Sequence, residues 1–388
     1  MNRCFLMMCI ILFQWRGSFA QIPKPYNHYD VTFGKHNKKL PEEASNIVRI
    51  FLDKDGNYYP EMYINDRDLR KCHNSLAEWY AENVDEFGEL CVINNIATGT
   101  FEEKLIKLND ALALKIANNI NARNENSYLV NVSIHGFSKK AYGVRIMNRL
   151  ASGDNKKLEA ALSQKAKGKL FFVEVYWDAK YIGMLQGSIL AKWSYIFRDA
   201  AMPNAMNVGL SLRKVISNIA NQHINIITHS LGARVACELL FNAEDSNIAR
   251  QHSIPTPQQA HIKLCMIAPA ICTGLFKNYW QRIPEVTKPV NDNYSISVVY
   301  NTNDIALNKS MPFLFFHIGN KTADDVACTS LGCDYKNDLA KLKDSMNNKL
   351  RTFNLSGKHG TPRIGHYLNH CYIRNKAPFA DVVEYLNE

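Results

Sequence analysis

The sequence predicts an α/β protein built on a doubly wound, mostly parallel sheet. Short apolar runs of strand length alternate along the chain with longer runs in which apolar residues recur at helical spacing. Strands that alternate with helices imply right-handed crossovers between parallel neighbours. One of these strands, at 224–228, runs into a helix that opens at Gly232, and Ser230 lies at the corner between them.

Composition favours a single globular domain with a leader. The chain has 388 residues, of which 46% are hydrophobic and 21% charged, and it contains no repeat, low-complexity tract or linker. Residues 1–20 have the pattern of a signal peptide, because Arg3 precedes an apolar run of about ten residues and Ser18-Phe19-Ala20 offers a cleavage site. We therefore expect export to a periplasm or to the medium. A retained anchor is the alternative.

Charge and cysteine content exclude some classes of function. The chain carries 46 basic and 36 acidic side chains, and its lysines are dispersed rather than clustered with aromatics. This predicts a basic surface with weak attraction to membranes or other anionic surfaces, and no nucleic-acid partner. Cysteine and histidine spacings fit no zinc site, so we expect no metal. Cys328 and Cys333 bracket a short loop and are the pair that we expect to form a disulfide, whereas Cys237 and Cys265 fit a core.

Before the alternating pattern begins, the sequence predicts an N-terminal extension. Residues 21–45 are polar and are expected to form an extended arm, followed by one domain at 46–388 with its core from about residue 88. An Asp-Gly turn at 53–57 lies between two β-rich runs, 48–52 and 58–63, and predicts a β-hairpin. This Asp-x-Asp-Gly stretch lacks the other ligands of a calcium loop. A helix at 75–83 and a strand at 89–93 complete this part.

The remaining elements follow from apolar periodicity. We expect strands at 128–134, 169–177, 224–228, 261–267, 295–300 and 350–355. We expect helices at 102–121, 141–151, 156–166, before 224, after Gly232 and at 378–387. Residues 178–206 form an apolar insertion after a strand's carboxyl end, where such sheets bind ligands. One interpretation is a helical cap lining an acyl pocket, with Trp193 and Phe197 in its wall. The other is an ordinary packed helix pair.

Ser230 is the candidate nucleophile. A strand, a tight turn and a helix around a serine form the context of a nucleophile elbow, although serine is also a common helix N-cap. A serine hydroxyl needs a base and a group that orients the base, and in this architecture the acid and then the histidine follow along the chain. Asp304, just beyond the strand at 295–300, is the candidate acid. Its alternative role is that of a turn or N-cap residue.

Three histidines follow the last strand, His359, His366 and His370. We select His366 as the base because it directly precedes the final helix, while the other two remain open. The oxyanion of an acyl-transfer reaction needs two backbone donors. Leu231 N–H at the helix start is one candidate, and Phe137 N–H, after His135-Gly136, is the other. A plain turn is the alternative reading of His135-Gly136.

These motifs have a known counterpart. The stretch from about 128 to 387 resembles the α/β-hydrolase superfamily in four pieces. These are His135-Gly136-Phe137, Thr228-His229-Ser230-Leu231-Gly232, Asn303-Asp304-Ile305-Ala306-Leu307 and Gly365-His366. The Asn-Asp-x-Ala-Leu string resembles a poorly characterised bacterial branch. Thr228 stands where the usual elbow has glycine, although Thr-His-Ser-x-Gly resembles bacterial lipase-like members.

The resemblance implies a Ser230–Asp304–His366 triad and an acyl-hydrolase reaction that needs no cofactor. We therefore expect an exported serine hydrolase that cleaves carboxylic esters, with a small-molecule or lipid ester as substrate. The same superfamily also contains non-catalytic binders. A catalytically silent binding protein of the cell envelope is accordingly the alternative function.

Overall fold

The computed structural model describes sixteen parts of the chain. These are residues 25–26, 43–61, 75–125, 127–136, 151–179, 182–183, 201–221, 223–241, 261–271, 294–302, 304, 307, 331–333, 338–346, 350–356 and 379–388. Of the helices in these parts, none is long and apolar enough to cross a membrane.

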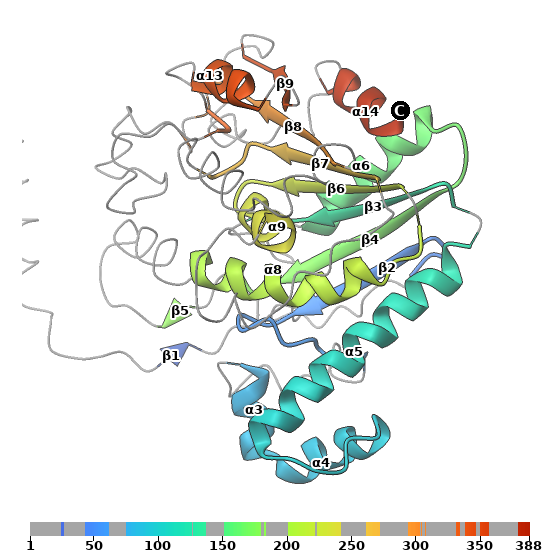
Figure 1. Cartoon of the computed structure of the whole chain (residues 1–388), viewed down its shortest axis with the longest axis vertical. Coiled ribbons are helices and arrows are strands. Elements are labelled where there is room, and N and C mark those ends of the chain that lie inside the picture. The colour runs from blue at the N-terminus through green and yellow to red at the C-terminus, as the bar shows by residue number, and fades with distance from the viewer. Residues whose placement is uncertain are drawn as a thin grey trace, which may run out of the picture.

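A seven-stranded, all-parallel sheet forms the centre of the molecule (Figure 1). Its strands lie in the order β2-β4-β3-β6-β7-β8-β9. Their bounds are β2 Ile47–Leu52, β3 Leu129–Ile134, β4 Leu170–Trp177, β6 His223–His229, β7 His261–Ile267, β8 Tyr294–Tyr300 and β9 Leu350–Asn354. Every residue of β4 is buried, as expected for a parallel strand covered on both faces. The predicted α/β fold class and the six strands expected from 128 onward are confirmed.

The winding direction of the sheet reverses between β3 and β6. From β3 the chain moves outward to β4 on one side, and from β6 it moves through β7 and β8 to β9 on the other. The carboxyl ends of two adjacent strands whose connections leave in opposite directions frame the crevice where α/β sheets bind ligands. In this sheet those ends are Gly136, beyond β3, and Ser230, beyond β6.

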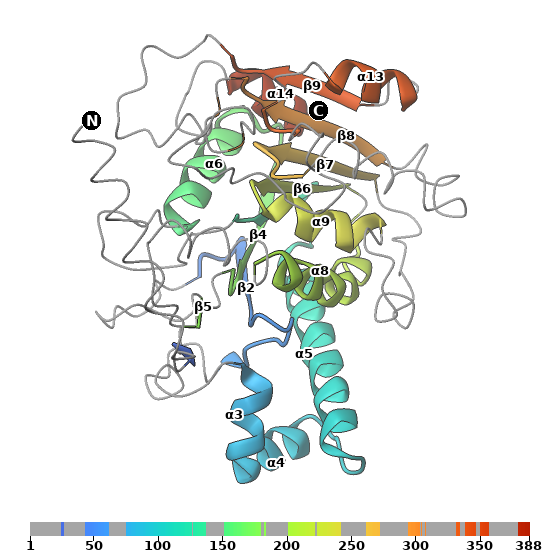
Figure 2. The same cartoon turned by 90° about the vertical axis from the view of Figure 1, so that its left-hand side faces the viewer.

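Helices cover both faces of the sheet (Figure 2). The helices α8 (Met202–Ser217) and α9 (Gly232–Phe241) pack together on one face, and α6 (Ala151–Lys165) and α14 (Ala380–Asn387) pack together on the other. A further helix, α13 (Asp338–Ser345), lies beside β9. The helix expected before residue 224 is therefore confirmed as α8, and its apolar residues Val208, Leu212, Val215 and Ile216 are buried.

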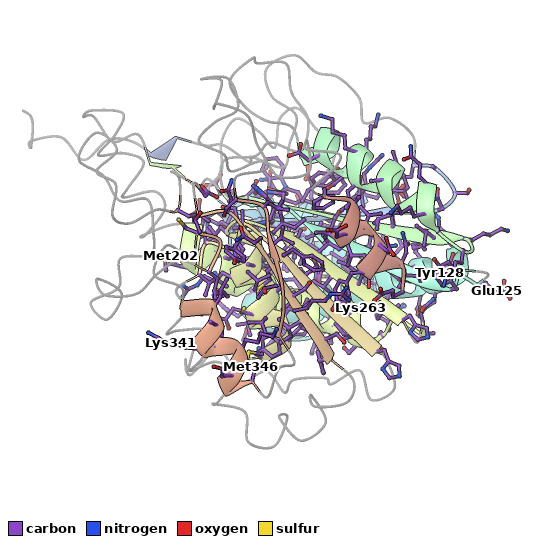
Figure 3. The ribbon with its side chains drawn as sticks, turned by 90° about the horizontal axis from the view of Figure 1, so that it is seen from above. Glu125, Tyr128, Met202, Lys263, Lys341 and Met346 are labelled. Atoms are coloured by element: carbon purple, nitrogen blue, oxygen red, sulfur yellow. The ribbon has the colours of Figure 1, made fainter. Side chains whose placement is uncertain are left out.

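The last helix is attached to the sheet through its carboxyl end. Lys263 on β7 lies close to α14 and donates from Nζ to Tyr385 O at 3.0 Å (Figure 3). Asn225 on β6 donates from Nδ2 to Leu386 O at 2.8 Å and to Asn131 Oδ1 at 2.9 Å. The last carbonyls of a helix have no intrahelical donor. Polar side chains of the sheet therefore satisfy these carbonyls and hold α14 in place.

The strand expected at 89–93 is wrong, because these residues end the helix α4 (Val84–Ile93). Phe87, Leu90 and Cys91 are buried at helical spacing, whereas Val92 and Ile93 are 74% and 65% exposed. A run of five mostly apolar residues is too short to distinguish the two periods. The helices α3 (Leu76–Glu82) and α5 (Phe101–Arg123), expected at 75–83 and 102–121, are confirmed.

The expected N-terminal hairpin exists only as its turn. Leu52 and Tyr58 form one antiparallel bridge, and Tyr59 N donates to Phe51 O at 3.0 Å. The first run instead joins the main sheet as the parallel edge strand β2. Arg49 on β2 forms a buried ion pair with Glu174 on β4, 2.9 Å from Nε to Oε2. The sheet therefore starts at Ile47, and the expected core boundary near residue 88 is wrong.

The arm at 21–45 and the insertion at 178–206 meet in a second, two-stranded sheet. In it β1 (Pro25–Tyr26) pairs antiparallel with β5 (Ile182–Gly183). The end of the insertion belongs to α8, which begins at Met202. The pocket residues Trp193 and Phe197 lie outside the described residues, as does the leader at 1–20.

The turn after β2 is organised by a buried carboxylate. Asp53 is fully buried and accepts hydrogen bonds from four N–H groups: the backbone of Asp55, Asn57 and Leu76 and the side chain of Asn57, at 2.8–3.0 Å. The bond from Leu76 N fixes the first turn of α3 to the carboxyl end of β2. Burial, with the Asp55 charge as a smaller cause, raises the pKa of Asp53 to about 6.

This environment gives Asp53 a pH-dependent effect on stability. Its pKa in the folded chain lies above the unfolded value of about 3.9, so the folded state binds the proton more tightly between these two values. We predict that the free energy of unfolding of the wild type, minus that of Asp53→Asn, falls by about 3 kcal/mol as the pH rises from about 4 to about 7. Urea unfolding of both proteins across this range measures the difference, and a difference independent of pH would contradict the prediction.

Candidate active site

Ser230 occupies a strained corner between β6 and α9. Its φ is +54°, a left-handed conformation that costs energy for a residue other than glycine. Ser230 N donates to Ile267 O at 2.9 Å, which extends the pairing of β6 with β7 past the end of the strand. Ser230 O accepts from Ala233 N at 3.1 Å and from Ala270 N at 3.2 Å. The backbone N–H and C=O of Ser230 are thus both hydrogen-bonded. The turn matches the strand-to-helix corner of a nucleophile elbow.

Two glycines let the chain pack tightly around this corner. A Cβ added to Gly136 would lie 2.5 Å from His229 O, 2.7 Å from Ser230 Cβ and 3.2 Å from Leu231 N. A Cβ added to Gly232 would lie 2.5 Å from Ile134 O and 2.8 Å from His135 O. The end of β3 therefore lies directly against the corner and against the backbone nitrogen of Leu231. No other residue type fits at either glycine without moving backbone.

The substitution of Thr228 for the usual elbow glycine is accommodated inside the strand. Thr228 is buried, and it pairs in register with Ile134 on one side and Met266 on the other. Its φ is not positive, so this position does not need a glycine conformation. The close approach occurs at Gly136 and Gly232 instead.

His135 fixes the loop that carries Gly136. Trp177 N donates to His135 Nε2 at 3.1 Å, and Trp177 Nε1 donates to His135 O at 2.9 Å. Because Nε2 accepts a hydrogen bond, Nδ1 carries the ring proton and donates it to Gly136 O at 2.8 Å. The rings of His135 and Trp177 also stack, with centroids 5.7 Å apart. His135 therefore ties the ends of β3 and β4 together.

Asp304 lies beyond β8 and is fully buried. Its backbone N donates to Asn301 O at 2.9 Å, and its Oδ1 accepts from Leu307 N at 3.3 Å. The carboxylate thus has the turn role that sequence analysis gave as the alternative. A carboxylate has about four acceptor positions, so Asp304 can accept more than this one hydrogen bond.

A short segment, 331–333, connects the loop of Asp304 with the corner of Ser230. Gly332 N donates to Pro269 O at 3.1 Å, and Gly332 O accepts from Asn301 N at 3.0 Å. A Cβ on Gly332 would lie 2.5 Å from Ala268 C, so this segment is in direct contact with the loop after β7. Since Ala270 N donates to Ser230 O, backbone hydrogen bonds lead from the serine through the loop after β7 and through Gly332 to Asn301 and Asp304.

The sequence does not predict a role for residues 331–333. These residues follow β8 by about thirty positions, and neither periodicity nor a charged side chain marks them. The disulfide expected between Cys328 and Cys333 stays a prediction, because Cys328 lies outside the described residues. Cys333 is buried, and its Sγ lies 3.5 Å from Thr302 O. Burial of Cys237 and Cys265 in the core is confirmed, and burial raises the pKa of both thiols, to about 12 for Cys265.

Of the predicted site residues, Ser230, Leu231 and Asp304 lie at the carboxyl edge of the sheet. His366 and its alternatives His359 and His370 lie outside the described residues, as does Phe137. Among the residues that the structure describes, no group of three or more His, Cys, Asp or Glu side chains could hold a metal ion.

The helix that follows the serine is held by buried charge. Arg213 on α8 donates from Nε to Glu238 O on α9 at 3.0 Å, and Glu238 and Arg234 are themselves buried. Burial lowers the pKa of Arg213, while the nearby Glu238 carboxylate opposes this shift. Gly209 allows α8 to approach closely, because an added Cβ would lie 2.5 Å from Val235 O. These contacts fix α9 behind the corner.

The close contact at Gly136 leads to a prediction about stability. Gly136→Ala forces the end of β3 away from the serine corner, and we expect it to lower the free energy of unfolding by about 1–3 kcal/mol. Gly88→Ala is the matched control, because a Cβ at that helical glycine meets nothing within 4 Å. Denaturant unfolding of both variants measures the effect. Equal stabilities would show that the corner has room that these distances exclude.

No protein-family model matches the sequence. No curated protein matches it either. Several solved structures match at low similarity, and three of them are typical. An uncharacterized protein from Bacillus cereus ATCC 10987 is 11% identical with a TM-score of 0.34, over 74% of this chain and 70% of that one. Esterase B from Lactobacillus rhamnosis (HN001) is 10% identical with a TM-score of 0.34, over 68% and 77%.

The third is a dienelactone hydrolase-like promiscuous phosphotriesterase from metagenomic libraries, 10% identical with a TM-score of 0.32, over 67% of this chain and 86% of that one. These identities and TM-scores are too low to assign a fold, so the fold is assigned from the geometry of this chain. The parallel sheet, the strained serine at its switch point and the buried acid beyond β8 together give the chain an α/β-hydrolase type of fold.

Proposed function

We propose that the chain is an exported serine hydrolase that cleaves carboxylic esters through an acyl-enzyme on Ser230. The observation that carries the proposal is the left-handed backbone of Ser230 at the switch point of the sheet. Backbone strain at a residue other than glycine persists only where the surrounding structure enforces it, and such strain concentrates at functional sites. An N-cap serine, the alternative from sequence, has an extended backbone rather than a left-handed one.

The proposed reaction has two halves. His366 takes the proton of Ser230 Oγ as the oxygen attacks the ester carbonyl, and it then gives this proton to the leaving alcohol. The acyl group stays on Oγ. In the second half, His366 takes a proton from water, the resulting hydroxide attacks the acyl carbonyl, and the proton returns to Oγ as the acid leaves. Asp304 orients the imidazole and stabilises its charged form.

The oxyanion of both tetrahedral intermediates would be bound by the backbone N–H groups of Leu231 and Phe137. Support for Leu231 is its place at the amino end of α9, where the helix dipole favours negative charge. Support for the loop of Phe137 is the contact of Gly136 with the serine corner. The support for Asp304 is its burial beyond β8 and the backbone connection to Ser230 through Gly332. The assignment of His366 rests on the sequence alone, as does export.

A covalent probe tests the nucleophile. We predict that a fluorophosphonate labels the wild type at neutral pH and that Ser230→Ala abolishes both labelling and ester hydrolysis, the latter by at least about 10⁴-fold. Ser217→Ala, which removes a hydroxyl at the far end of α8, keeps both. Among His359→Ala, His366→Ala and His370→Ala, we expect only the second to behave like Ser230→Ala. Mass spectrometry of the labelled protein also shows whether residues 1–20 have been removed.

An absence of Ser230-dependent labelling, in protein shown to be folded by a cooperative unfolding transition, would exclude the enzyme. The envelope-binding alternative would then be the better reading of the fold.

The size of the acyl group is a second testable part of the proposal. If the insertion at 178–206 lines an acyl pocket, truncating Trp193 or Phe197 to alanine changes the relative kcat/KM across p-nitrophenyl esters from acetate to palmitate. A lost aromatic wall removes apolar contact with long chains, so we expect the largest fall for the longest ester that the wild type accepts. Leu114→Ala, on the exposed side of α5, is the control and leaves the profile unchanged. An unaltered profile in both pocket variants would mean that the insertion does not contact the acyl chain.

A further inference from the structure

Residues 75–103 form a strongly acidic part of a basic protein, which we name the acidic lobe. It consists of α3, α4 and the start of α5, and it extends beyond the sheet (Figures 1 and 2). It carries no lysine, arginine or histidine and seven acidic residues: Glu78, Glu82, Asp85, Glu86, Glu89, Glu102 and Glu103. The rest of the chain carries 46 basic and 29 acidic residues. The lobe is therefore locally acidic, and Lys107 on α5 reaches its edge and donates from Nζ to Thr98 O at 3.2 Å.

Apolar side chains are exposed on the same helices. Within the part of the chain that the structure describes, every large hydrophobic residue that is highly exposed lies on α4 or α5: Val84, Val92, Ile93, Ile106 and Leu114. On α4, Glu89 and Ile93 are one turn apart and share the solvent face with Val92. Scattered exposed apolar residues are ordinary, but their confinement to one pair of helices indicates a contact surface.

A surface of opposite charge lies elsewhere on the same molecule. The helix α6 and the turn after it expose five lysines, Lys156, Lys157, Lys165, Lys167 and Lys169. We name these residues the lysine face. Of the two acids in this stretch, Asp154 is buried and Glu159 is only partly exposed, and burial and the nearby Glu174 charge raise the pKa of Glu159. Of the lysines, Lys165 forms an exposed ion pair with Glu384 at 3.4 Å.

The lobe and the lysine face cannot meet within one chain. Figures 1 and 2 both show α6 against one face of the sheet, well away from α3 and α4, which project beyond the sheet at its β2 end. Any contact between these two surfaces must therefore join two copies. The extended methylene chains of lysine side chains offer apolar surface, so the lysine face can receive both the carboxylates and the apolar side chains of α4.

We propose that the acidic lobe of one copy binds the lysine face of a second copy. Carboxylates around Glu86 and Glu89 pair with ammonium groups of α6, and Val92 and Ile93 pack on the lysine stems. The contact joins two different surfaces, so it leaves one lobe and one lysine face open at the ends of each assembly. The proposal does not depend on hydrolase activity. A protein without catalysis would assemble in the same way.

Such an interface is electrostatic and weakens with salt. At an ionic strength of about 0.1 M, exposed charges interact over only about 10 Å. We expect the weight-average sedimentation coefficient to rise with protein concentration in about 20 mM salt and to become independent of concentration in about 0.5 M salt. Val92→Ser/Ile93→Ser weakens the association at low salt, because it removes the apolar part of the contact.

A charge swap provides the decisive experiment. Glu86→Lys/Glu89→Lys reverses two charges at the proposed contact on the lobe, and Lys156→Glu/Lys157→Glu reverses two charges of the lysine face. Each variant alone is expected to sediment as a monomer at low salt. Mixed in equal amounts they associate again, since the lysines introduced on the lobe of one variant now pair with the glutamates introduced on the face of the other. The control is Lys115→Glu/Lys341→Glu, which changes the net charge by as much as Lys156→Glu/Lys157→Glu but at other exposed sites. It is expected to leave self-association intact.

Restored association in the mixture supports the proposal and also shows that both variants are folded. Monomeric wild type at low salt over the full concentration range would overturn it. Self-association that survives both charge reversals would overturn it equally, because it would place the interface elsewhere.

Discussion

The left-handed backbone of Ser230 is the constraint on which the rest of the site depends. Two hydrogen bonds to the strand β7 and to the loop beyond it hold this peptide in a conformation that an isolated chain would avoid. The surrounding chain must then come very close, which explains why Gly136 and Gly232 flank the corner and why His135 is locked against Trp177. The conformation of one residue thus accounts for the identity of several others.

The parallel sheet also determines where Asp304 lies. Parallel strands present all their carboxyl ends at one edge, so loops from distant parts of the sequence become neighbours there. The segment at 331–333 lies between the loops after β7 and β8 and bonds to both. Asp304 bonds to Asn301 and Leu307 in its own loop, and this loop is held through Gly332 to the loop after β7. In the proposed reaction, a buried carboxylate fixed in this way would need little reorganisation when His366 becomes charged.

Sequence patterns predicted the core of this arrangement because they report burial. Strands such as 170–177 are apolar along their whole length, and the corner at Ser230 follows from the change of period on either side of it. The pattern failed at 89–93 and at 48–63. At 89–93 a five-residue run is too short to distinguish the helical period from the strand period. At 48–63 the local turn signal predicted a hairpin, whereas the first run pairs with a distant strand, supported by the ion pair of Arg49 with Glu174. The contribution of Gly332 could not be read from the sequence, since it consists of backbone contacts across the sheet edge.

The long helix α5 has a mechanical consequence. It begins with a capping box between Thr100 and Glu103, spans 23 residues and would be about 35 Å long at the usual rise. Asn109, within it, bonds to Tyr58 N at 3.0 Å and to Asn57 Oδ1 at 2.6 Å, beside the turn of Asp53. A displacement of the outer end of α5 is thus transmitted to the sheet at β2. That strand is the edge of the sheet, with β4 and β3 between it and β6. The helix α5 also packs against α8, which in turn holds α9, so it is connected to the serine corner more directly through α8 than through the sheet.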